Sequence, residues 1–102
     1  MSKPSTTITV ADLIPEDAQY DFDPATNLAT INIEVGRAHD KGGVQFADVT
    51  ARLSVVGEGE DAMLEAEYVS HEFSGKGELS KEWIGYALLV IEANDFGVQM
   101  PK

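Results

Sequence analysis

The sequence contains no cysteine among its 102 residues. Disulfide bonds and thiolate metal sites are therefore excluded, and a reducing compartment is permitted. No apolar run approaches the roughly 18 residues of a membrane span. The first seven residues, Met-Ser-Lys-Pro-Ser-Thr-Thr, have no apolar stretch of the kind found in a signal peptide. We therefore expect a cytoplasmic protein that does not bind membranes.

Basic residues are scarce as well. Seven lysines and arginines face eighteen aspartates and glutamates, which leaves a formal net charge of −11. This balance disfavours direct binding to nucleic acids and to anionic membranes. The acids gather in two stretches without a base, one between Lys3 and Arg37 and one between Arg52 and Lys76. Two interpretations stay open: the acids keep the surface soluble, or they form a platform for a basic protein.

Catalytic and metal-binding patterns are also missing. The two histidines, His39 and His71, lie in separate segments without an HExxH pattern. Ser70, His71 and Glu72 are consecutive on an expected strand, where neighbouring side chains point to opposite faces and cannot form a triad among themselves. We expect no catalytic residue, no metal site and no cofactor, and we interpret the chain as a non-enzyme.

What the sequence does contain is a long predicted β-hairpin. Residues 44–56 and 62–73 alternate apolar with polar side chains around an acidic turn at 57–61. Residues 31–35 alternate in the same way, and a shorter alternation starts at Tyr20. Residues 20–73 therefore predict four antiparallel strands in meander order. Two changes of parity predict β-bulges near residues 47–48 and 68–69.

A helix is predicted over residues 80–95. Ser80 is a good N-cap, and the residues from Trp83 to Ala93 are nearly all apolar. The fold class is therefore α+β: an antiparallel four-stranded meander sheet with one C-terminal helix packed on its apolar face. We expect one domain over residues 1–102, with a loose tail at 1–6, a short edge strand at 7–10 and a turn or one helical turn at 11–19.

The order of these parts resembles the bacterial export chaperone SecB. The likeness lies in residues 29–75: Ile31-Asn32-Ile33-Glu34-Val35, a long strand over 46–56, a short acidic turn, and a second long strand that closes on His71-Glu72-Phe73-Ser74-Gly75. The resemblance implies an acidic, oligomeric, ATP-independent binder of unfolded polypeptide.

The main hypothesis is thus an acidic module that binds protein, either a non-native polypeptide or a basic protein surface. Two alternatives stay open: a small acidic inhibitor of the phage anti-defence type, which imitates nucleic acid, and a subunit of a structural assembly. The predicted acidic partner-binding residues are Glu34, Glu58, Glu60, Asp61, Glu65 and Glu67. The predicted apolar surface for binding or homo-oligomer formation consists of Phe46, Tyr68, Val69, Phe73, Trp83, Tyr86 and Val90.

Overall fold

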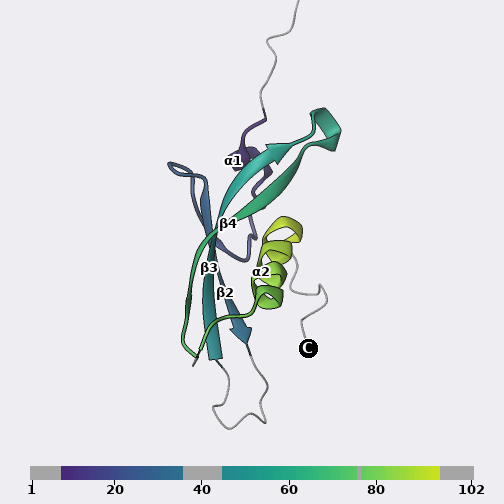
Figure 1. Ribbon diagram of the computed structural model, residues 1–102. Coiled ribbons are helices and arrows are strands. Elements are labelled where there is room, and N and C mark those ends of the chain that lie inside the picture. Colours follow the sequence, from purple (N-terminus) through teal and green to yellow (C-terminus); the bar gives the residue numbers. More distant parts are fainter. Residues whose placement is uncertain (1–7, 36–44, 76, 95–102) are drawn as a thin grey trace, which may run out of the picture.

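The computed structural model describes residues 8–35, 45–75 and 77–94. In chain order, the elements are α1 (Val10–Leu13), β1 (Asp21–Asp23), β2 (Leu28–Val35), β3 (Gln45–Val56), the 3-10 turn η1 (Gly59–Asp61), β4 (Met63–Phe73) and α2 (Lys81–Ala93). The strands form one antiparallel sheet in the order β1-β2-β3-β4, and α2 packs on one face (Figure 1). The predicted α+β fold class is therefore confirmed.

The core forms where the alternating strands meet the helix. Directly paired residues share a face of an antiparallel sheet, so the apolar positions of β2 and β3 fall on the same side. The buried strand residues are Ala29, Ile31, Ile33, Val35, Ala47, Val49, Ala51 and Leu53. The buried residues of α2 are Tyr86, Ala87, Val90 and Ile91. We call the side of the sheet toward α2 the inner face and the opposite side the outer face.

One predicted bulge is confirmed and the other is wrong. Thr50 pairs with Ser70, but Ala51 pairs with Tyr68, so Val69 is an extra residue in β4. At residues 47–48 the register runs without a shift on both sides of β3. Phe46 lies simply on the outer face, 44% exposed, where the sequence pattern suggested a change of parity.

The short edge strand predicted at residues 7–10 is wrong where the structure describes it. Thr9 is the N-cap of the single turn α1. Its hydroxyl accepts from the Asp12 main-chain N–H at 3.3 Å, and the Asp12 carboxylate accepts from the Thr9 N–H at 2.9 Å. These reciprocal bonds form a capping box, which favours a helical turn over a strand. They also hold the pKa of Asp12 below its ordinary value, the main-chain N–H of Thr9 contributing most.

The predicted helix is confirmed over Lys81–Ala93, and Asp95 lies outside the described residues. The Ser80 hydroxyl accepts from the Trp83 main-chain N–H at 3.4 Å. At the other end, Asn94 adopts a left-handed conformation with φ of 51°. Its side-chain oxygen accepts from the Gln19 main-chain N–H at 2.9 Å, which ties the loop before β1 to the end of α2.

Candidate functional site

The outer face of the sheet is the most distinctive surface of the chain, because α2 packs on the opposite side (Figure 1). Strand pairing places seven carboxylates and a single guanidinium, that of Arg52, on this face among the described residues. Seven acids and one base give the face a formal charge of −6. The carboxylates belong to Asp21, Asp23, Glu34, Asp48, Glu65, Glu67 and Glu72.

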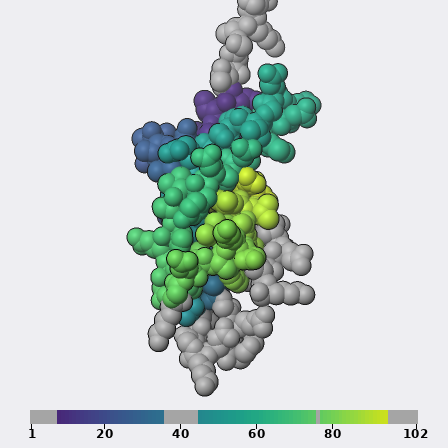
Figure 2. All heavy atoms as spheres, viewed as in Figure 1, coloured from purple at the N-terminus to yellow at the C-terminus, as the bar shows by residue number. Residues whose placement is uncertain are grey.

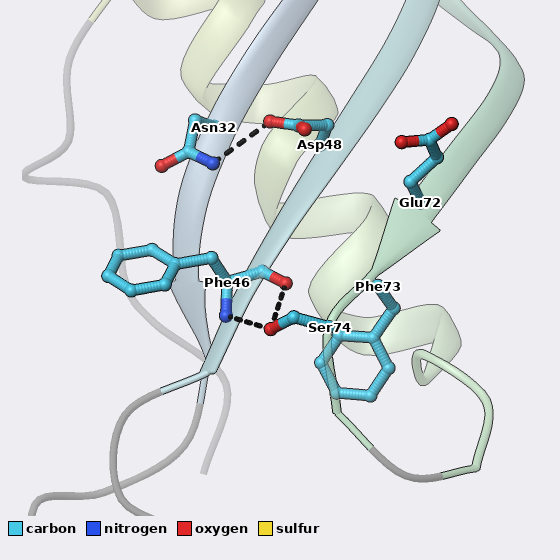
Figure 3. Close-up of a pocket in the computed structure, with 6 residues that line it drawn as sticks. All are labelled: Asn32, Phe46, Asp48, Glu72, Phe73 and Ser74. Carbon is cyan, nitrogen blue, oxygen red and sulfur yellow. Dashed lines mark hydrogen bonds between the residues drawn. The ribbon is translucent and has the colours of Figure 1, made fainter.

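Asp48 lies on β3, two residues after Phe46 on this face and between β2 and β4. It is paired with Asn32 on β2 and with Glu72 on β4. The Asn32 side-chain amide donates to Asp48 Oδ1 at 2.9 Å, as Figure 3 shows. Asp48 and Glu72 are thus like charges placed directly opposite each other, an arrangement that destabilises a sheet. A positive group from outside the chain would relieve this repulsion.

Two shallow depressions meet over these two carboxylates. One of about 220 Å³ is lined by Asn32, Phe46, Asp48, Glu72, Phe73 and Ser74. The other, of about 260 Å³, is lined by Thr30, Asp48, Thr50, Ser70, His71 and Glu72. Both are open hollows on the surface of the sheet. Their volumes suit the end of a single side chain better than a cofactor.

Phe46 supplies an exposed aromatic ring beside the carboxylates. Its main-chain N–H donates to Ser74 Oγ at 2.9 Å, and the Ser74 hydroxyl donates to the Phe46 carbonyl at 3.0 Å (Figure 3). Ser74 therefore holds the Phe46 backbone, and with it the base of the Phe46 side chain, in place. Glu34 is directly opposite Phe46 on β2, and Asp48 follows two residues later on the same face. The ring is thus flanked by two carboxylates.

The structure divides the predicted acidic residues into separate groups. Glu58, Glu60 and Asp61 are exposed at the hairpin turn, whereas Glu65 and Glu67 lie on the outer face of β4. At about 3.3 Å per residue, the length of β3 puts about 33 Å between the turn and Phe46. Glu34 lies at that far end of the hairpin, so these six acids do not make one site.

The alternation of the strands also places polar side chains together on the outer face. Thr30, Glu34, Arg52, Glu65 and Glu67 all point away from α2, and Arg52 is paired directly with Glu67. Arg52 therefore lies among the glutamates of the outer face.

The predicted apolar surface is also divided. Phe46 lies on the outer face, Tyr68 and Val69 are 41% and 39% exposed at the bulge, and Phe73 is half-buried. On α2, Trp83 is half-buried and packs edge-on against Tyr86, with ring centroids 5.4 Å apart.

Tyr86 and Val90 need a correction, because both are buried between α2 and the sheet and neither forms exposed surface. Because nearly all residues of α2 from Trp83 to Ala93 are apolar, the sequence did not indicate which side of the helix faces the sheet.

The sequence did not lead us to predict four of the outer-face carboxylates as site residues, Asp21, Asp23, Asp48 and Glu72, nor Ser74, which bonds to the Phe46 backbone. Counting back from the turn gives the pair Asp48–Glu72 once the extra residue at Val69 is allowed for. The sequence therefore contains enough information to predict that Asp48 and Glu72 are paired. The contact of Ser74 with the Phe46 backbone depends on how the chain leaves β4, and the strand pattern does not contain that information.

Comparisons with known proteins give no relative. No protein-family model matches the chain, and no curated protein or solved structure matches it. The likeness to SecB stays a prediction from the strand pattern. Among the described residues, no group of three or more acidic or histidine side chains is arranged to hold a metal ion. No helix in the same ranges is long and apolar enough to cross a membrane.

Proposed function

We propose that this chain is a non-enzymatic module that binds a polypeptide carrying both basic and apolar side chains. The observation that supports it is the outer face, which no helix of the described residues covers and which carries seven carboxylates, one guanidinium and the exposed ring of Phe46. A non-native polypeptide is the partner of choice, because an unfolded chain offers apolar and cationic side chains close together. This is the kind of substrate that the resemblance to SecB implies.

The surroundings of Phe46 suit a lysine or arginine side chain. A cation over an aromatic face gains about 0.5–1 kcal/mol at an exposed site. Glu34 and Asp48 flank the ring on the same face and would add Coulomb attraction. The aliphatic stem of the same side chain would cover the ring and the depression beside it. Each such contact is weak, so a long polypeptide that makes several of them would bind more tightly than a single side chain.

An acidic inhibitor of a folded basic protein is the second candidate, and the charge of the outer face favours it. Acids spaced at i, i+2 on one strand lie about 6.6 Å apart, while successive phosphates along one DNA strand advance about 3.4 Å. One strand alone is therefore too sparse to imitate a nucleic acid backbone. Carboxylates from β2, β3 and β4 together supply a denser array, since adjacent strands lie about 4.8 Å apart.

The decisive experiment measures the affinity for a fluorescent, permanently unfolded basic polypeptide from 50 mM to 1 M salt. Under the main proposal, binding weakens with salt but persists at 1 M, because apolar burial is not screened. Phe46→Ala should weaken binding about fivefold, which corresponds to about 1 kcal/mol, at every salt concentration. Asp48→Asn should weaken it at low salt and have little effect at 1 M.

Glu16→Gln is the matched control, since Glu16 is an exposed acid in the loop between α1 and β1 and lies outside the outer face. It should leave the affinity close to that of the wild type. If binding disappears at 1 M salt and Phe46→Ala has no effect, the inhibitor hypothesis replaces the chaperone-like one. No binding of the unfolded polypeptide at any salt concentration would contradict the main proposal.

A further inference from the structure

The long edge of the sheet at β4 is open. β4 spans Met63–Phe73 and pairs with β3 on one side, while no strand of the described part of the chain pairs on its other side. Proteins usually protect such edges with lysine, proline, a bulge or a covering element. β4 contains neither lysine nor proline. Its protection consists of the bulge at Val69 and the packing of α2 beside it, which includes a side-chain hydrogen bond to the strand edge.

Glu92 accepts that hydrogen bond. Its Oε2 accepts a hydrogen bond of 2.8 Å from the main-chain N–H of Ala66, a group that points away from β3. Figure 2 shows β4 and α2 side by side, which places the last turn of the helix within reach of the strand. A carboxylate in the last turn is unfavourable for the helix dipole. The bond to Ala66 offsets this cost and occupies the position that the carbonyl of a neighbouring strand would take.

We propose that residues 63–68 of β4 accept an extended basic segment of a partner protein as a fifth strand of the sheet. The main-chain groups of Leu64 and Tyr68 point the same way as those of Ala66, since orientation alternates along a strand. A partner residue opposite Ala66 would bond to both its N–H and its C=O, and the partner's carbonyl would displace Glu92. The inference rests on the proposed function and adds the place and the backbone conformation of the partner.

The side chains of β4 define the partner's chemistry. Glu65 and Glu67 point to the outer face, and their backbones face β3, so the partner residues opposite them form close, non-hydrogen-bonded pairs. Opposite charges in such pairs stabilise a sheet by roughly 0.2–1 kcal/mol each. The partner residue between these two basic residues would lie opposite Ala66. Its side chain would point to the inner face, where a small apolar residue fits. The expected motif is therefore basic, small apolar, basic.

A second copy of this chain fits the edge poorly. An antiparallel pair of β4 strands would bring three further glutamates alongside Glu65, Glu67 and Glu72. Like charges opposite each other destabilise a sheet. With a net charge of −11 on each copy, association at this edge would be opposed by charge over its whole length. Charge complementarity therefore selects a basic partner.

The test uses a ten-residue peptide in which lysine alternates with valine or alanine, and a peptide of the same composition with its lysines in one block. The alternating peptide should bind more tightly. Methylating the main-chain nitrogen of the residue opposite Ala66 removes a hydrogen-bond donor and should lower the affinity at least about tenfold. The N-methyl peptide keeps every charge, so equal binding of both peptides would overturn the inference.

Glu92→Ala provides the second arm, with Glu78→Ala as a control for the loss of one exposed carboxylate. Removing Glu92 frees the Ala66 N–H and should tighten binding of the alternating peptide several-fold, whereas Glu78→Ala should weaken it slightly. If Glu92→Ala weakens binding as much as the control, Glu92 does not compete with the partner and the inference fails. If Phe46→Ala still weakens binding of unfolded polypeptide in that case, the proposed function stands without the edge.

Discussion

Tyr20 is a core residue with an unsatisfied hydroxyl. Its side chain is 9% exposed, and its oxygen has no hydrogen-bond partner in the part of the chain that the structure describes. Burial raises the pKa of this phenol, because the phenolate would lose its hydration. A buried polar group without a partner costs about 1–3 kcal/mol.

We therefore expect Tyr20→Phe to raise the free energy of unfolding by about 1 kcal/mol, measured by urea denaturation. Tyr68→Phe is the contrasting variant, since the Tyr68 hydroxyl bonds to His71 Nδ1 at 2.7 Å on an exposed surface. Its effect should stay within about 0.5 kcal/mol. A clear loss of stability in Tyr20→Phe would mean that its hydroxyl has a partner in solution.

Asn94 combines a backbone role with a side-chain role. Its left-handed conformation, with φ of 51°, ends α2, and its side chain contacts Gln19 and Asp17. Asn94→Gly keeps the conformation accessible and removes the side-chain bonds, which should cost about 1 kcal/mol of unfolding free energy. Asn94→Ala should cost about 1 kcal/mol more, because alanine resists the left-handed region. Equal stability of the two variants would show that the conformation does not select the residue.

At the scale of elements, the strands and the helix were predictable because their signals are local. The alternation in β2 and β3 and the cap at Ser80 each determine structure within a few residues. The turn α1 was partly missed, although Thr9 and Asp12 have the spacing of a capping box. Contacts between distant segments were not predictable. The bond from Ala66 to Glu92 depends on where α2 lies across the sheet, which no local pattern specifies.

The capping box of α1 makes a pH-dependent contribution to stability. The folded-state pKa of Asp12 lies below the unfolded value of 3.8, so its stabilising effect is present above pH 3.8 and is lost as the pH falls through the folded value. Asp12→Asn should therefore be less stable than the wild type at pH 6, and the difference should shrink below pH 3.8. Thermal unfolding of both proteins from pH 6 to pH 2.5 checks this. A constant difference would contradict the assignment.

At the scale of the whole molecule, the apolar sequence of α2 led us to predict a homo-oligomer. The chain itself buries Tyr86 and Val90, which removes them from any such surface. Leu89 is 54% exposed on the same helix, with Trp83 and Leu88 half-buried. Leu89 is therefore the residue on which self-association through α2 would depend, since a β4-to-β4 contact would place glutamates opposite one another.

Salt separates self-association from partner binding, because the two respond in opposite directions. Two copies that each carry a charge of −11 repel, and the screening length falls from about 10 Å at 0.1 M salt to about 3 Å at 1 M. A dimer held by apolar contacts at Leu89 should therefore strengthen as salt rises, while binding of a basic segment weakens. Light scattering at both salt concentrations, with Leu89→Glu as the variant that abolishes the dimer, measures this. A monomer of 11.0 kDa at high protein concentration and 1 M salt would rule out the dimer.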